Sequence, residues 1–276
     1  MVLIKEYRTV LPLTVAEYQK GHHWVVNSEI NSGKKNVVVL ERKPYKDEET
    51  GIQGEYVKRK SGNDPNTPTI IRKLAPSGSL EMFEEIWETY PATKTVITNG
   101  YMKEKLKVTF RSTVLPDPGT SESPHKIPSD QNVETVFNDF LKTSEKNPAH
   151  DPTQFYSNKT GRGKLSSTWV TDALNKNGDR QPDGSCFGET PVMCIYTLLE
   201  VEFNVFGLQS TMEKTLHSQL YQSLIAHQRA IFCTIDSWHD LTLTEIHAMI
   251  QDKKQGDGKS KNSNIVDDIE KIQITN

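Results

Sequence analysis

The sequence predicts an α+β fold in which a curved sheet wraps around a long helix. The clearest strand is 194–206, where Thr197, Leu199 and Val201 alternate with more polar residues. This alternation indicates one face turned to a core and one mostly wet face. After Gly207, apolar residues recur every four positions, which predicts the longest helix; they are Leu208, Met212, Leu216, Leu220 and Leu224.

The N-terminal elements follow from local signals. Residues 2–12 predict a strand, and Thr14 with Glu17 forms a capping box that opens a helix running to about Asn27. Further strands are expected at 36–41, 54–60 and 69–74. Ser79 is expected to cap a second helix that buries Leu80, Phe83 and Trp87 by their spacing and ends at Tyr90-Pro91.

The remaining elements are shorter. Residues 93–99 and 106–112 are β-branched strands joined through Gly100, and 133–141 is either a strand or a short helix. Thr242 and Glu245 form a second capping box, which opens the last helix. A sheet gripping a helix can leave a cavity that suits an apolar ligand, although the pattern alone favours an ordinary filled core.

Composition limits the class of protein. The chain has 276 residues, only 34% of them hydrophobic, and a net charge of −3, so nothing favours nucleic acid as a partner. We expect one domain over 1–252 and a flexible tail over 253–276. Lys5, Glu6 and Arg8 exclude a signal peptide, and no apolar run spans a membrane. The three cysteines form no C-x-x-C pair, which indicates reduced thiols and a cytoplasmic protein.

Catalytic and metal motifs are missing. The sequence has no G-x-S-x-G, H-E-x-x-H or G-x-G-x-x-G, and Gly256–Ser260 lacks the first glycine and the strand of a P-loop. His22 and His23 are neighbours on a helix, so we expect a surface pair and no metal site. The protein is therefore predicted to be no enzyme and to use no cofactor.

Many short motifs follow one another in a characteristic order from residue 1 to about 250. Examples are Trp87, Tyr90-Pro91 and Asp236. The other segments are 1–8, 11–12, 17–19, 75–78, 95–99, 101–103, 159–163, 193–194, 207–209, 231–233 and 240–242. In order and spacing, these motifs resemble the phosphatidylinositol transfer protein family.

The resemblance implies a START-like helix-grip fold, in which a curved, mainly antiparallel sheet and long helices enclose a lipid cavity. It implies a soluble monomer that carries phosphatidylinositol or phosphatidylcholine and touches membranes transiently. By the same resemblance the helix 242–252 is a lid, the loop 112–134 is regulatory, and Ser157 lies where the family has a phosphorylation site. The alternative is a sensor or adaptor that binds a lipid and presents it to a partner protein.

The resemblance also assigns lipid contacts one position at a time. Four inositol-contacting positions hold Val57, Arg59, Glu88 and Ile250, and none keeps the family residue. Val57 and Ile250 cannot hydrogen-bond a ring hydroxyl, so we expect weakened inositol selectivity.

The phosphate-contacting positions are better kept. The resemblance places His22, Thr95, Ser112 and Thr197 at these positions, and each offers a polar hydrogen or hydroxyl. The six expected lipid-binding residues are therefore His22, Arg59, Glu88, Thr95, Ser112 and Thr197. The family's membrane-docking pair falls on Val205 and Phe206, just before Gly207.

Overall fold

The computed structural model describes residues 2–32, 36–62, 81–122, 124–127, 133–142, 148–176 and 190–249. The expected strand at 69–74, the Ser79 cap, Ile250, Cys186 and the tail 253–276 lie outside these residues. The elements are β1 (Leu3–Leu11), α1 (Val15–Asn31), β2 (Asn36–Lys46), β3 (Gln53–Gly62), β4 (Met82–Thr89), β5 (Ala92–Asn99), β6 (Lys103–Leu115), β7 (Glu134–Asn138), η1 (Pro148–His150), α3 (Trp169–Lys176), β8 (Met193–Phe203), α4 (Gln209–Cys233), α5 (Ile235–Trp238) and α6 (Leu243–Ala248).

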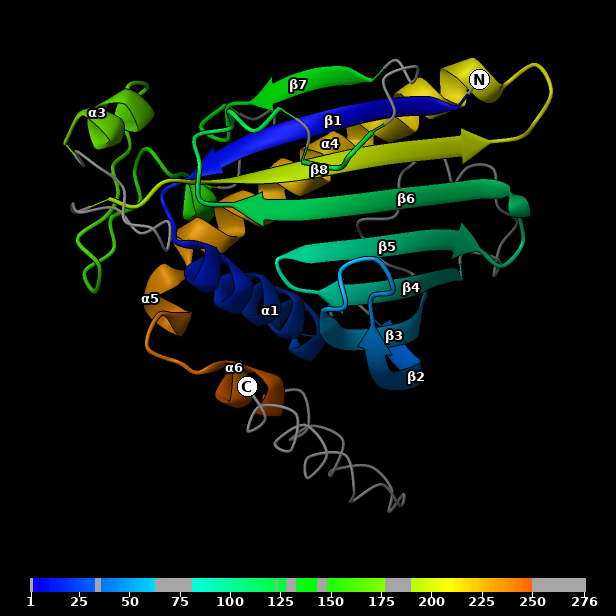
Figure 1. Cartoon of the computed structure of the whole chain (residues 1–276), viewed down its shortest axis with the longest axis horizontal. Helices are drawn as coiled ribbons and strands as arrows, with labels where there is room; N and C mark the ends of the chain where they lie inside the picture. The colour runs from blue at the N-terminus through cyan, green and yellow to red at the C-terminus, as the bar shows by residue number, and fades with distance from the viewer. Residues whose placement is uncertain are drawn as a thin grey trace.

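One large curved sheet dominates the part of the chain that the structure describes (Figure 1). Its eight strands lie in the order β2-β3-β4-β5-β6-β8-β1-β7. Every neighbouring pair is antiparallel except β1 with β7, and the two end strands do not pair, so the sheet stays open. The mixed α and β architecture with a curved, mainly antiparallel sheet confirms that part of the predicted fold.

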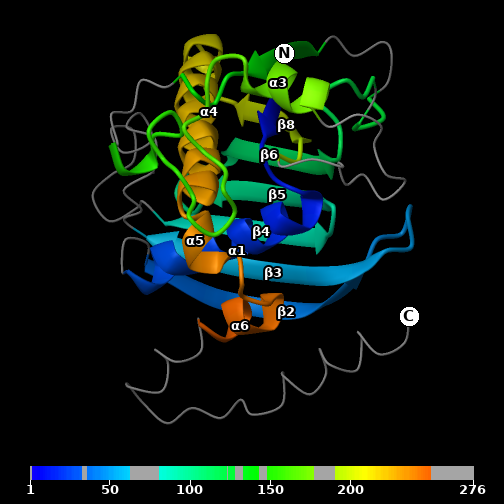
Figure 2. The same cartoon turned by 90° about the vertical axis from the view of Figure 1, so that its left-hand side faces the viewer.

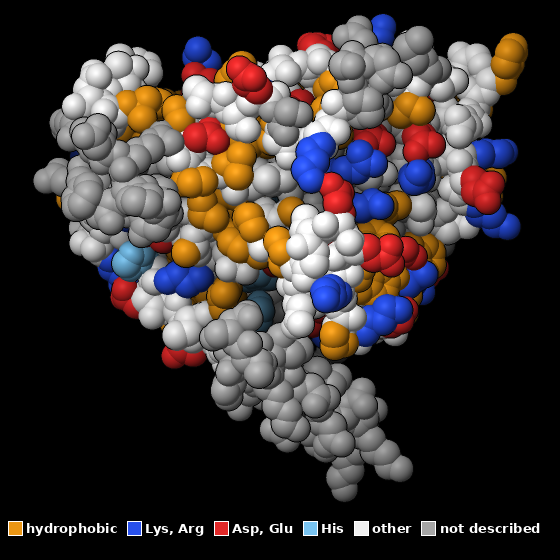
Figure 3. All heavy atoms as spheres, viewed as in Figure 1, with side chains coloured by type: hydrophobic (Ala, Val, Ile, Leu, Met, Phe, Trp, Pro, Cys, Tyr) orange, Lys and Arg blue, Asp and Glu red, His pale blue; other side chains and the backbone are white. Residues whose placement is uncertain are grey.

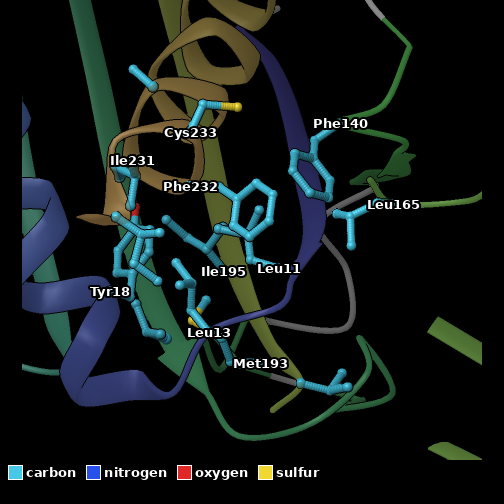
Figure 4. Packing of buried hydrophobic residues seen from close by; sticks show 14 of the residues in the cluster. Leu11, Leu13, Tyr18, Phe140, Leu165, Met193, Ile195, Ile231, Phe232 and Cys233 are labelled. Atoms are coloured by element: carbon cyan, nitrogen blue, oxygen red, sulfur yellow. The ribbon is translucent and has the colours of Figure 1, made fainter. Parts of the chain in front are cut away.

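Helices α1 and α4 cover one face of this sheet, which we call the inner face (Figure 2). Around the end of α4, buried side chains from α1, β1, β8 and α5 form one core with Phe140 and Trp169. Tyr18, Phe140 and Phe232 are among its aromatic members (Figure 4), together with Trp238. A second core lies under the first half of α4, where Leu216 packs with Leu199 and Phe203. These two cores fix α1 and α4 against the sheet.

Both predicted capping boxes are present. The Thr14 hydroxyl accepts from the Glu17 amide at 3.1 Å, and the Glu17 carboxylate accepts from the Thr14 amide at 2.7 Å. Thr242 and Glu245 repeat the arrangement at the start of α6. The orphan amides of both helix starts are therefore satisfied by their own first turns.

The helix predicted after Ser79 is wrong over its described part, because 82–89 is strand β4. Phe83 and Trp87 are four residues apart, a spacing that fits one face of a helix and equally one face of a strand. Pairing with β3 on one side and β5 on the other decides between them. Trp87 consequently lies on the outer face, where its ring meets Tyr56 with the centroids 5.3 Å apart.

Three other expectations change in detail. The strand expected at 36–41 continues to Lys46, and the segment that was ambiguous at 133–141 is the strand β7. The second face of β8 was expected to be mostly wet, but Tyr196 and Leu198 on that face are buried. The loop after β6 covers this end of the strand, because the Tyr196 hydroxyl donates to Asp117 at 2.5 Å and accepts from the Ser121 amide.

Among the residues that the structure describes, no helix is both long and apolar enough to cross a membrane.

Candidate functional site

A row of polar side chains crosses the inner face of the sheet. Glu88 of β4 lies opposite Thr93 of β5, Thr93 opposite Ser112 of β6, Ser112 opposite Thr197 of β8, and Thr197 opposite Tyr7 of β1. Directly opposed residues share a face, so these five side chains form one row. The Ser112 and Thr197 hydroxyls are 3.2 Å apart and hydrogen-bond each other. The row thus offers a track of hydroxyls inside the fold.

The far end of this polar row is fixed by His217 of α4. Its Nε2 lies 2.8 Å from the Leu3 carbonyl oxygen, which can only accept, so Nε2 carries the proton. Nδ1 of a neutral ring then accepts from the Tyr7 hydroxyl at 3.3 Å. Burial lowers the pKa of His217, which favours this neutral form.

The next two rows on the inner face are mostly apolar. One runs through Ile86, Thr95, Phe110 and Leu199, and the other runs from Glu84 through residues of β5, β6 and β8. Several apolar side chains between these rows and α4 remain only partly buried although they pack against the core; these are Ile97, Phe110, Val136, Leu220, Tyr221 and Leu224. Apolar surface is thus left uncovered between the sheet and its helix.

At the β3–β4 end, charged inner-face side chains are paired with one another. Arg59 Nη2 lies 2.6 Å from Glu84 Oε2, and both side chains are mostly buried. Four residues further along β4, Glu88 Oε1 lies 2.8 Å from Nε2 of His23 on α1. Burial alone would raise the pKa of Glu88, but the hydrogen bond with His23 and the neighbouring imidazoles lower it below its usual value.

The neighbouring histidine, His22, points to α4 instead. Its Nδ1 lies 2.9 Å from His227 Nε2, so one of the two rings donates to the other. Burial, reinforced by His227 and His23, lowers the pKa of His22 well below its usual value. The expected surface pair is therefore wrong: the two rings diverge, as neighbours on a helix must, but both contact partners inside the fold.

Helix α6 is held against α1 close to this charged end. The Asn27 side-chain amide donates to the Ile246 carbonyl oxygen at 2.8 Å, and Asn31 donates to the Met249 carbonyl oxygen at 2.9 Å. The ring of His247 meets His23 edge to face, with centroids 4.8 Å apart. His23 therefore links α6, α1 and the Glu88 carboxylate of β4.

The β8–α4 turn projects from the opposite end of the sheet. Phe206 is fully exposed, while Val205 is partly buried against the core under α4. Gly207 has φ +78, a conformation that favours glycine, and it turns the chain into α4. The expected docking pair thus divides into one outward and one inward side chain.

The structure puts five of the six expected lipid-binding residues on the inner face of the sheet; they are Arg59, Glu88, Thr95, Ser112 and Thr197. The sixth, His22, lies on α1 and contacts His227 of α4. The sequence reasoning missed His23, Glu84 and Thr93 as members of the site. Glu84, Ile86 and Glu88 alternate with Phe83, Glu85 and Trp87, and this period of two was the signal that would have revealed the strand and its inward carboxylates.

No group of histidine, cysteine, aspartate and glutamate side chains able to hold a metal ion occurs in the described ranges. Cys194 and Cys233 are buried free thiols, and burial raises the pKa of each to about 12, so neither is a reactive thiolate.

Residues 2–255 match a protein family described as phosphatidylinositol transfer protein. The chain belongs to this family. It is 35% identical over 259 residues to the human phosphatidylinositol transfer protein beta isoform, covering 90% of this chain and 91% of that protein. It is 31% identical to Dictyostelium discoideum phosphatidylinositol transfer protein 5, covering 89% of this chain and 83% of that protein.

A longer member of the phosphatidylinositol transfer protein family is also similar. The human membrane-associated phosphatidylinositol transfer protein 1 is 29% identical over 259 residues, which cover 90% of this chain but only 20% of that protein. In the larger relative the matched region is therefore one part of a longer chain.

Proposed function

We propose that this protein is a soluble, monomeric carrier that extracts one phospholipid from a membrane, encloses it between the inner face and α1 and α4, and delivers it to another membrane. Membership of the phosphatidylinositol transfer protein family is the observation that carries the proposal. The open curved sheet with its covering helices supports the START-like helix-grip arrangement that such a carrier needs. We place the carrier in the cytoplasm, with transient visits to membranes.

The energetics explain why a lipid needs such a container. Two acyl chains contain about 30 methylene groups, and burial of each is worth about 0.8 kcal/mol, so free transfer through water would cost roughly 20–25 kcal/mol. A carrier lowers this barrier by offering a dry apolar surface. The partly uncovered side chains Ile97, Phe110 and Leu220 supply apolar surface of this kind between the sheet and α4.

The rows of the inner face suggest how the lipid lies. We place the phosphate along the hydroxyls of Ser112, Thr197 and Thr95, and the acyl chains over the apolar side chains that face α4. The headgroup then reaches the charged end formed by Arg59, Glu84, Glu88 and His23. This placement uses hydrogen-bond donors for the anionic phosphate and keeps the apolar chains on apolar surface.

The charged end favours a zwitterionic headgroup over inositol. Inositol needs several donors and acceptors for its ring hydroxyls, but Val57 offers none, and Arg59 is already engaged by Glu84 at 2.6 Å. A choline or ethanolamine group instead brings one positive charge, which the Glu88 carboxylate attracts, because its lowered pKa keeps it ionised and its partner is the His23 imidazole instead of a guanidinium. We therefore propose phosphatidylcholine-type lipids as the preferred cargo.

The first experiment identifies the cargo and its movement. The purified full chain is analysed by mass spectrometry for co-purified lipid, and labelled phosphatidylcholine and phosphatidylinositol are followed between vesicles. We expect bound phosphatidylcholine and its transfer. Recovery of phosphatidylinositol as the main bound lipid would overturn the headgroup preference. Lipid that stays bound but never moves between vesicles would overturn the carrier function in favour of a lipid sensor or adaptor.

A pair of variants tests the hydroxyl row. Thr197→Val removes an inner-face hydroxyl with little change of shape, whereas Thr109→Val makes the same change at a buried outer-face position of β6. We expect about a tenfold loss of bound lipid for Thr197→Val, since a hydrogen bond to a charged group is worth about 1.5–3 kcal/mol. Equal loss in both variants would show that Thr197 acts only through stability.

A second pair tests the docking role of the β8–α4 turn. Phe206→Ala is expected to slow transfer between vesicles while leaving the bound lipid intact, because Phe206 is exposed and remote from the polar row. The control is Phe137→Ala, which truncates an exposed phenylalanine on the edge strand β7. Unchanged transfer by Phe206→Ala would remove the docking role.

A further inference from the structure

We propose that the β5–β6 turn, with Tyr101, Lys103 and Lys105, is a second membrane-docking element that directs this protein to anionic membranes. The inference rests on the proposed carrier function, since only a carrier that visits membranes uses such a surface. It concerns which membrane surface the protein meets, whereas the proposal above concerns which lipid it carries.

This turn lies beside the β8–α4 turn at one end of the sheet (Figure 1). The Asn204 amide donates to the Lys105 carbonyl oxygen at 2.8 Å, which ties the two turns together. Between them is an open hollow of about 370 Å³ lined by Tyr101, Met102, Lys105, Phe203, Val205 and Leu208. Residues of both turns therefore build one continuous surface.

The turn holds its exposed aromatic residue in a fixed place. The buried Asn99 side-chain oxygen accepts from the amides of Tyr101 and Met102, at 3.1 and 2.9 Å, and its Nδ2 donates to the Glu81 carbonyl oxygen. The Lys105 amide closes the turn on the Met102 carbonyl oxygen. Docking then requires little ordering of the backbone, so little conformational entropy is lost on binding.

Large apolar side chains project from this surface instead of packing. Phe206 is 103% exposed, Tyr101 58% and Leu208 46%. Tyrosine is enriched at membrane–water interfaces, because its ring is apolar and its hydroxyl reaches water and headgroups. Exposed apolar residues on two adjacent turns indicate an interaction surface.

The charges of the β5–β6 turn select the kind of partner. Other outer-face lysines of the sheet have partners. Lys107 pairs with Glu202 at 2.9 Å, and Lys58 and Lys60 pair with carboxylates of β4 and its start. Lys94 lies over the Trp87 ring, with its Nζ 5.1 Å from the ring centroid. In the described part of the chain, neither Lys103 nor Lys105 has such a partner, and both are exposed. Basic side chains with an acidic one among them project from the right-hand edge of the molecule (Figure 3). Glu104 lies between the two lysines, so the turn keeps an excess of one positive charge, although the chain as a whole carries −3.

An anionic lipid surface fits both the exposed apolar side chains and the lysines of the β5–β6 turn. Basic side chains near a membrane surface gain from its negative potential, and their aliphatic stems can lie along the apolar boundary while the ammonium groups stay in water. The aromatic side chains enter the headgroup region at the same depth. We therefore commit to an anionic bilayer, and not to a protein partner, as the occupant of this surface.

The test measures binding of the full chain to phosphatidylcholine vesicles with and without phosphatidylserine. Lys103→Gln with Lys105→Gln is expected to lower binding to the phosphatidylserine vesicles roughly thirtyfold, with little change on neutral vesicles. The matched control is Lys126→Gln with Lys142→Gln, since both of these lysines are exposed and paired with single carboxylates elsewhere. Tyr101→Ser is expected to weaken binding to both kinds of vesicle, and Tyr156→Ser, at a 50% exposed tyrosine of another loop, is its control.

Three results would overturn the proposal. Binding of the Lys103 and Lys105 variant equal to that of the unmodified protein would do so, as would an equal loss in the control pair. Sedimentation that shows self-association lost in Tyr101→Ser, without vesicle binding by the unmodified protein, would assign the surface to a second copy of the chain. Transfer activity is measured separately, so a protein that binds anionic vesicles in this way but moves no lipid would refute the carrier function and leave the docking surface standing.

Discussion

Replacing Gly21 by alanine should destabilise the protein, because α1 approaches the end of α4 and α5 closely at this glycine. A Cβ at position 21 would lie 2.6 Å from the branched methyl Cγ2 of Ile231 and 2.8 Å from Cζ2 of Trp238. Both neighbours are fully buried, and neither a β-branched side chain nor an indole ring can rotate aside easily. The helix axes would have to separate.

The expected magnitude follows from two opposing terms. Overpacking a filled core costs about 1–3 kcal/mol, and two stiff, buried neighbours place this site in the upper half of that range. Alanine gains about 1 kcal/mol over glycine within a helix. The net loss is then about 1–2 kcal/mol, which lowers the melting temperature by about 2–6 °C in a chain of this size.

Circular dichroism melting of matched variants measures this effect. Gly62→Ala is the control, because a Cβ at position 62 meets nothing within 4 Å, and it should be neutral or slightly stabilising. In an Ile231→Leu background, which removes the Cγ2 methyl, Gly21→Ala should cost at least about 0.5 kcal/mol less. Equal melting temperatures for the two glycine variants, or strict additivity with Ile231→Leu, would refute the steric reasoning.

Three further predictions use other contacts. Arg162→Met should cost about 3 kcal/mol in urea unfolding, the lower end of the range for breaking a buried ion pair. It removes the guanidinium bound to the Glu17 carboxylate at 2.9 and 3.0 Å and leaves that carboxylate with the Thr14 amide and His239; a loss below about 1 kcal/mol would contradict this. Stability should fall as the pH drops below about 6.5, since the unfolded chain protonates His22 there while the folded chain, which lowers the pKa of His22, does not; His22→Gln should make the fall shallower, and an unchanged slope would count against it. Asn27→Ala should speed amide hydrogen exchange in α6, because it removes the 2.8 Å bond to the Ile246 carbonyl oxygen, and unchanged protection of α6 would show that other contacts hold this helix.

Elements with a strong local signal were predictable from the sequence. Both capping boxes and the alternation in β8 place their elements within a few residues. A capping box is made of hydrogen bonds within the first turn of its helix, and the alternating residues of β8 lie on alternating faces of the strand, so neither depends on distant segments. The extent of β2 was not predictable in this way. Its second half is charged and exposed, and it is a strand only because β3 pairs with it as far as Lys46.

The placement of the candidate residues in the fold was predictable from the sequence only in part. Five of the six expected residues share the inner face and His22 lies on α1, yet their own patterns do not say so, because strand order and register depend on contacts between distant segments. Glu88 is adjacent to Thr93 only through the β4–β5 pairing, and Thr197 meets Ser112 from a strand 85 residues later. The partners His23 and Glu84 become visible only once that register is known.

Because β4 is a strand, the two carboxylates of the charged end, Glu84 and Glu88, lie far apart. On a helix, Glu84 and Glu88 would lie one turn apart, about 6 Å along the axis, and would repel each other. In the extended strand their Cα atoms are separated by about 13 Å, with Ile86 between them on the same face. Each carboxylate therefore has its own partner, Glu84 with Arg59 and Glu88 with His23.

Two separate pairs bind a ligand differently from one acidic cluster. A cluster would attract any cation strongly, whereas a paired carboxylate keeps lone pairs for a weakly held positive group and loses little when that group leaves. A carrier needs this balance, because it must release its cargo at the next membrane. On the proposed function, the strand that the sequence pattern concealed is thus the element that separates the two carboxylates between which a zwitterionic headgroup would lie.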